Sequence, residues 1–204
     1  MAAWPDGDAF SADSNANEAR FRTRVEARTD QRWLNTGRIA NADTYEILGL
    51  ESILNLGALQ IVSEYQCNWL QRDLGGSDLF FQGAYVYVAY MLTGEHMPYD
   101  RATSSLDSVE PFENFFLVNR CRGGHGGGWG AWQVAARYSY LDLSGQDVLG
   151  GVGNDLTLAL NWYFTPNSKL QFNYITGNID EHEPVGGFTA GNYSILGTRF
   201  MMFF

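Results

Sequence analysis

The feature that most constrains the fold of this chain is an alternation of apolar and polar residues with a period of two. Such alternation places apolar side chains on one face of an extended strand and polar side chains on the other. In residues 154–165 one face carries Leu156, Leu158, Leu160, Trp162 and Phe164. Residues 169–177 repeat the pattern after the turn 165–168, so these segments predict a β-hairpin with one apolar face.

Eight segments carry this pattern, some more sharply than others. They are residues 19–29, 43–52, 56–66, 79–95, 129–143, 154–165, 169–177 and 194–204. The 15% aromatic share and the 23 glycines, with only 5 prolines, also favour strands joined by glycine-containing turns. We therefore predict an all-β, antiparallel fold of about eight strands.

Two architectures bury such faces: a soluble sandwich or lipocalin-like barrel with the apolar side inward, or a transmembrane β-barrel with that side toward lipid. Aromatic residues gather at strand ends, and the polar faces carry arginine and amide side chains rather than lysine and glutamate. Both observations favour the transmembrane barrel. No stretch approaches the roughly 18 apolar residues of a membrane-spanning helix, so a helical membrane protein is excluded.

The connections between the segments differ in length. Residues 51–55 and 165–168 predict short periplasmic turns, and the longer outer loops are expected at 67–78, 144–153 and 177–192. The connection 94–128 is long enough to hide a strand pair near 115–122 or to fold into the barrel lumen. Residues 1–18 are acidic and lack the pattern of a secretion signal, so we expect a flexible N-terminal segment before a barrel domain at 19–204.

Several motifs in order resemble the C-terminal half of the phosphate- and polyphosphate-selective porins O and P. They are LTGE at 92–95 with Tyr99 after it, GAWQVAARYSYLDL at 130–143, LTLALNWYFTPNSKLQFNYI at 156–175 and ILGTRF at 195–200. The resemblance runs from about residue 19 and is strongest from residue 79. It implies a sixteen-stranded barrel in the bacterial outer membrane, usually trimeric, that passes phosphate or polyphosphate through an arginine-lined pore.

Only about eight strands are visible, so the resemblance implies half of such a barrel, a fragment from which the signal peptide and the N-terminal half are missing. The apolar ending 201–204 resembles the last strand of an outer-membrane barrel, which the barrel assembly machinery recognises. The expected partners are outer-membrane lipid, phosphate or other anions, this machinery and, in the full-length form, two further copies in a homotrimer. We expect no nucleic-acid partner.

Arginine accounts for 12 of the 13 basic residues, and its planar fork suits bidentate capture of oxyanions. Four arginines occupy same-face positions in 19–29, and two more are expected to face the same compartment from other strands. The predicted pore-lining, anion-binding set is Arg20, Arg22, Arg24, Arg28, Arg137 and Arg199. The alternative for each arginine is a solvated residue of a polar lumen. Glu26 interrupts the row, and the net charge of −10 leaves the anion preference open.

The sequence contains no arrangement of serine or cysteine with histidine and a carboxylate, and no histidine spacing typical of a metal site. We therefore expect no enzyme activity, no cofactor and no metal. The first hypothesis is a passive anion channel or a truncated part of one. The alternatives are a small closed eight-stranded barrel that does not conduct and serves as a structural or binding module, and a soluble lipocalin-like binder.

Overall fold

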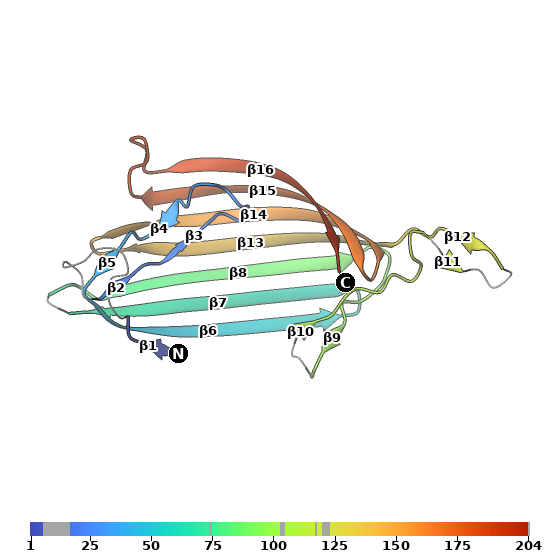
Figure 1. Ribbon diagram of the computed structural model, residues 1–204, viewed down its shortest axis with the longest axis horizontal. Helices are drawn as coiled ribbons and strands as arrows, with labels where there is room; N and C mark the ends of the chain where they lie inside the picture. Colours follow the sequence, from blue (N-terminus) through green and yellow to red (C-terminus); the bar gives the residue numbers. More distant parts are fainter. Residues whose placement is uncertain (6–16, 74, 103–104, 117, 120–122, 204) are drawn as a thin grey trace.

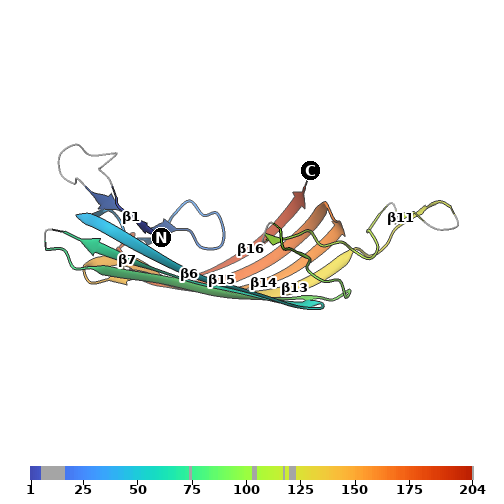
Figure 2. The ribbon, with the colours of Figure 1, turned by 90° about the horizontal axis from the view of Figure 1, so that it is seen from below.

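The computed structural model describes residues 1–5, 17–73, 75–102, 105–116, 118–119 and 123–203. Its main element is a curved antiparallel sheet in the order β1-β6-β7-β8-β13-β14-β15-β16 (Figures 1 and 2). The strands are β1 (Ala2–Ala3), β6 (Ala42–Leu56), β7 (Leu59–Arg72), β8 (Leu79–Met91), β13 (Ala131–Gly145), β14 (Val148–Thr165), β15 (Ser168–His182) and β16 (Gly191–Met202). The sheet is open, with β1 and β16 at its two edges.

Among the residues that the structure describes, four pairs of two-residue strands lie outside this sheet. Two of them, β2 (Glu18–Ala19) with β5 (Ile39–Ala40) and β3 (Arg22–Thr23) with β4 (Leu34–Asn35), close residues 17–40 into a folded-back segment that we call the arm. Figure 2 shows the sheet curving toward the side on which the arm lies. The other two pairs, β9 (Tyr99–Asp100) with β10 (Ser105–Leu106) and β11 (Val118–Asn119) with β12 (His125–Gly126), belong to the connection between β8 and β13.

The predicted hairpin is confirmed by the pairing of β14 with β15, in which Leu158 lies opposite Tyr174 and Asn161 opposite Gln171. The apolar side chains of these strands point to the convex side, away from the arm. Apolar side chains of the neighbouring strands also point to this side. Exposed apolar residues of this convex face include Leu48, Leu54, Val88, Val134, Leu158, Phe172, Leu196 and Phe200. An apolar surface of this kind is typical of a face that contacts lipid or another protein. The alternative of a lipocalin-like barrel, with these faces turned inward, is therefore wrong.

The prediction of residues 19–29 as a strand of the sheet is wrong. This stretch belongs to the arm, and its strand pairings among the described residues are those of Glu18–Ala19 and Arg22–Thr23 within the arm itself. The eighth strand of the sheet is instead Ala2–Ala3, which pairs with β6. Residues 6–16, most of the expected flexible N-terminal segment, lie outside the described residues.

Strands β6, β7, β14, β15 and β16 are longer than predicted, whereas β8 ends at Met91, before the predicted residue 95. The β6–β7 turn is at 57–58 rather than 51–55, and β14 begins at Val148, inside the expected loop 144–153. The glycines of that stretch suggested a loop, but they allow close packing within a strand. A Cβ at Gly150 would lie 2.1 Å from the backbone oxygen of Leu143, and a Cβ at Gly153 would lie 3.0 Å from Leu34 of the arm.

The long connection between β8 and β13 lies at one end of the sheet, and β11 and β12 project beyond it (Figure 1). Val109 packs with Met91, Ala131 and Tyr163 on the concave side. Phe115 packs on the convex side, with its ring 4.6 Å from that of Trp162. The connection thus covers the rim of the sheet on both faces.

The described residues include no helix long and apolar enough to cross a membrane.

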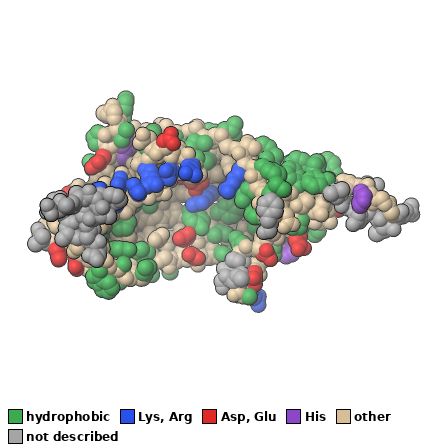
Figure 3. Space-filling view, viewed as in Figure 1, with side chains coloured by type: hydrophobic (Ala, Val, Ile, Leu, Met, Phe, Trp, Pro, Cys, Tyr) green, Lys and Arg blue, Asp and Glu red, His purple; other side chains and the backbone are tan. Residues whose placement is uncertain are grey.

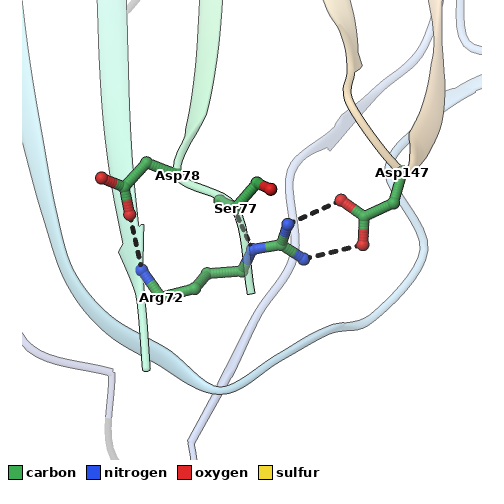
Figure 4. A network of polar contacts seen from close by, with 4 residues as sticks. All are labelled: Arg72, Ser77, Asp78 and Asp147. Atoms are coloured by element: carbon green, nitrogen blue, oxygen red, sulfur yellow. Dashed lines mark hydrogen bonds and ion pairs between the residues drawn. The ribbon is translucent and has the colours of Figure 1, made fainter. Parts of the chain in front are cut away.

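At the other end of the sheet, Arg72 joins two turns (Figure 4). Its Nη1 and Nη2 donate to the two carboxylate oxygens of Asp147 over 2.9 and 2.6 Å, and its backbone N–H donates to Asp78. The Arg72 side chain is 6% exposed, whereas that of Asp147 is 63% exposed. The hydrogen bonds from Arg72 lower the pKa of Asp147 below its ordinary value of 3.8.

We predict that a carboxyl NMR titration will place the midpoint of Asp147 below 3.8 and that Arg72→Gln will raise it. Because the folded-state pKa is lowered, the pair stabilises the fold above the ordinary pKa, and this contribution is lost as the pH falls through the folded-state value. Solvent exposure limits it to at most about 1 kcal/mol. A midpoint that does not move in Arg72→Gln would contradict this assignment.

Candidate functional site

The arm is attached to the concave face by apolar side chains near its two ends. Ala19, Leu34 and Ile39 are buried together with Leu70, Phe81 and other wall residues. The ring of Phe21 lies 5.2 Å from that of Phe81. The alternation within 19–29 therefore reflects packing on the wall rather than strand pairing. Phe21 and Val25 point toward the wall, and the intervening arginines stay outside the apolar cluster.

Hydrogen bonds join the two limbs of the arm. The backbone N–H of Phe21 donates to Thr36 Oγ1 over 3.0 Å, and the Thr36 N–H donates to the Phe21 carbonyl over 2.9 Å. Arg20 Nε donates to Asn35 Oδ1, also over 2.9 Å. These bonds close the base of the arm and hold its basic limb in a defined path along the wall.

Glu26 connects the middle of the arm to the wall. Its Oε1 lies 2.8 Å from Arg137 Nε and accepts a 2.8 Å hydrogen bond from Ser139 Oγ, while its Oε2 accepts a 2.5 Å hydrogen bond from Thr157 Oγ1. Arg137 and Ser139 belong to β13, and Thr157 lies directly opposite Arg137 on β14. One carboxylate thus binds two adjacent strands.

Arg137 was predicted as a pore-lining residue, and the structure places it on the concave wall in an ion pair. Besides the contact with Glu26, its guanidinium carbon lies 4.1 Å from the ring centroid of Tyr85, and its Nε is 3.1 Å from Ser139 Oγ. A cation–π contact and a charged partner hold the guanidinium in one orientation. Its positive charge is therefore largely compensated by Glu26.

Two cavities adjoin the arm. The first, of about 610 Å³, lies between the arm and the wall, with Arg20, Arg22 and Arg24 on the arm side and Glu64 and Asp155 on the wall side. The second, of about 670 Å³, is lined by Arg22, Thr23, Arg24, Val25, Glu26, Ala27, Arg28, Arg32 and Arg137. Figure 3 shows basic side chains in a row along the hollowed face, with acidic side chains across the hollow.

This row on the arm contains four of the six predicted arginines, namely Arg20, Arg22, Arg24 and Arg28. Arg137 lies beside the row, and Arg199 does not belong to it. That residue lies opposite Gln171 on the edge strand β16 and lines neither cavity. Within the part of the chain that the structure describes, Arg22 and Arg28 form no ion pair. These two guanidinium groups are thus available to an anion.

Sequence reasoning missed Arg32, which lines the second cavity from the far limb of the arm. The positive charge of Arg22 lowers the pKa of Arg32, and burial and the charges of Arg24 and Arg20 act in the same direction. Arg32 lies beyond the alternating stretch, so no periodic signal marked it. The lowered pKa agrees with a group of like charges, which a bound anion would stabilise.

The described residues contain no group of three or more histidine, cysteine, aspartate or glutamate side chains that could hold a metal ion. What the arrangement offers is reversible binding of an anion by several guanidinium groups, which donate paired hydrogen bonds to oxyanions.

Comparison with known proteins gives a consistent result. A family model described as phosphate-selective porin O and P matches residues 1–204. Porin O of Pseudomonas aeruginosa is 28% identical over 145 residues, which cover 66% of this chain and 30% of that protein. An uncharacterised protein of Caulobacter vibrioides is 29% identical over 126 residues, covering 62% of this chain and 23% of that protein. The matches thus span less than a third of each relative.

We predict that inorganic phosphate slows trypsin cleavage after Arg22, Arg28 and Arg32 by at least about threefold, compared with chloride at equal ionic strength. Bound phosphate engages these side chains and opposes local opening of the arm. Cleavage after Arg101, in the connection between β8 and β13, serves as the internal control. Equal slowing at Arg101 would show an effect on the protease rather than binding at the arm.

Proposed function

Because the chain belongs to the phosphate-selective porin O and P family, we propose that it forms part of an outer-membrane channel for passive diffusion of phosphate or polyphosphate. Proteins of this family are non-enzymatic outer-membrane porins, and the family implies a β-barrel. In this proposal the convex face contacts lipid, the concave face lines a water-filled lumen, and the arm lies inside that lumen.

The row of arginines on the arm is the observation that carries the proposal. A phosphate ion that enters a narrow lumen loses hydration and needs charge and hydrogen-bond donors in return. Alternate residues of an extended segment lie about 7 Å apart, so Arg20, Arg22 and Arg24 offer successive binding positions. An ion held by one guanidinium is within reach of the next, which gives several moderate sites rather than one trap.

The open sheet requires completion in this proposal. The edges at β1 and β16 leave backbone N–H and C=O groups that lipid cannot satisfy. We propose that further strands pair with both edges to give the sixteen-stranded barrel, usually trimeric, that the family resemblance implies. The matches cover less than a third of each relative's length, which agrees with this proposal. A closed eight-stranded barrel is not supported, because β1 spans only Ala2–Ala3 and β16 is not its neighbour.

We predict that replacing both Arg22 and Arg24 by alanine shifts the reversal potential under a KCl gradient from the anion side toward zero. The completed barrel, with strands paired to both edges of the sheet, is measured in planar bilayers, because the sign of this potential reports which ion permeates. The matched control is Lys169→Ala with Arg199→Ala, which also removes two cations but from positions that line neither cavity. An equal shift in the control would mean that total charge, not the arm, sets selectivity.

We also predict that Leu158→Arg lowers the folded fraction in lipid vesicles, because a charged side chain on a lipid-facing strand costs about 2–4 kcal/mol near the bilayer centre. Asn173→Arg, on the concave side of the neighbouring strand β15, is expected to fold almost as well as the unmodified chain. Heat-dependent gel mobility measures the folded fraction. Similar losses in both variants would contradict the assignment of the convex face to lipid.

A further inference from the structure

An acidic residue in the middle of the basic row needs an explanation. Glu26 lies between Arg24 and Arg28, and by charge alone it weakens anion binding. We propose that Glu26 is a positioning residue that holds the arginine row at the wall, so that its net effect is to strengthen anion binding. This inference rests on the proposed function, because it concerns the same anion site.

The first support is the direction in which the carboxylate points. Both oxygens of Glu26 are engaged by the wall, one by Arg137 and Ser139 and the other by Thr157, at distances of 2.5 to 2.8 Å. The side chain of Glu26 is 17% exposed. Its negative charge is thus directed at Arg137, which compensates it, although Glu26 lines both cavities beside the arm.

The second support is the distribution of contacts along the arm. The buried apolar residues of the arm lie near its ends, at Ala19, Leu34 and Ile39, with Phe21 and Val25 packed beside them. Between residues 26 and 32, the hydrogen bonds and ion pairs that reach the sheet from described residues all pass through Glu26. Without it, the stretch that carries Arg28 and Arg32 has lost its polar attachment to the wall.

The third support is the repulsion within the row. Arg22, Arg24 and Arg20 are close enough to Arg32 to disfavour its positive charge. Like charges held together on a short segment repel one another, which disfavours the compact path of the arm. The contacts of Glu26 with two strands oppose this repulsion, and charge-assisted hydrogen bonds of this kind are stronger than neutral ones.

The direction in which Glu26→Gln changes phosphate affinity distinguishes a positioning role from a purely electrostatic one. If Glu26 acted only through its charge, Glu26→Gln would strengthen phosphate binding by about twofold, as expected when one screened negative charge is removed. If Glu26 positions the arm, Glu26→Gln weakens phosphate binding by about threefold or more, because the binding conformation becomes less populated. Glu64→Gln is the matched control, since Glu64 lines the same cavity from β7 and forms no described contact with the arm. We expect it to strengthen binding.

A second variant tests the position without changing any charge. Ser139→Ala combined with Thr157→Val removes the two hydroxyl groups that donate to Glu26. We expect weaker phosphate binding and faster hydrogen exchange of the amides at residues 22–32, with unchanged exchange in β14 and β15. Isothermal titration with inorganic phosphate measures the affinity of the detergent-refolded chain, and mass spectrometry measures the exchange.

The outcomes separate the two proposals. Weaker binding in Glu26→Gln and in the hydroxyl variant, with stronger binding in Glu64→Gln, supports the positioning role. Stronger binding in Glu26→Gln, or unchanged exchange at residues 22–32, overturns it while leaving the anion site in place. If the unmodified chain binds no phosphate but its arm still opens in both variants, the tether exists and the proposed function fails.

Discussion

The opposite polarity of the two faces of the sheet is the constraint on which the rest of the structure depends. Strands β14 and β15 place apolar side chains such as Leu158 and Phe172 on the convex side and polar ones such as Asn161 and Gln171 on the concave side. The apolar face must be covered, and in an outer-membrane porin lipid covers it. The concave face then remains polar, and the charged arm can bind to it while its arginines stay hydrated.

The arm follows from that arrangement. Its apolar residues pack where the sheet offers an apolar patch around Leu70 and Phe81, and its arginines remain over the hollow. Arg137 was expected to bind anions directly, but its partner is Glu26, so it contributes to the site by holding the arm. In the proposed channel the charges that bind anions would therefore reside on a segment attached to the wall rather than on the wall itself.

Local patterns predicted much of this fold. The alternation at 154–177 gave the hairpin and its apolar face, and the motifs gave the family, because both depend on neighbouring residues. The arm was misread as a strand because an amphipathic segment alternates whether it pairs in a sheet or packs on one. The difference lies in partners far along the chain, such as Glu26 with Arg137. Strand ends were also misplaced, since Gly150 and Gly153 permit close packing that single-sequence reasoning assigns to loops.

The central claim is that the arginine row lies inside the curve of the sheet, fixed by Glu26 at β13 and β14. Solid-state NMR of the protein in lipid bilayers tests it directly, through the dipolar coupling between the Glu26 carboxyl carbon and Arg137 Nε. The account predicts a measurable coupling, because the 2.8 Å separation of Oε1 and Nε keeps the carboxyl carbon close to Nε. Absence of this coupling in a folded sample with the β13–β14 pairing intact would contradict the account.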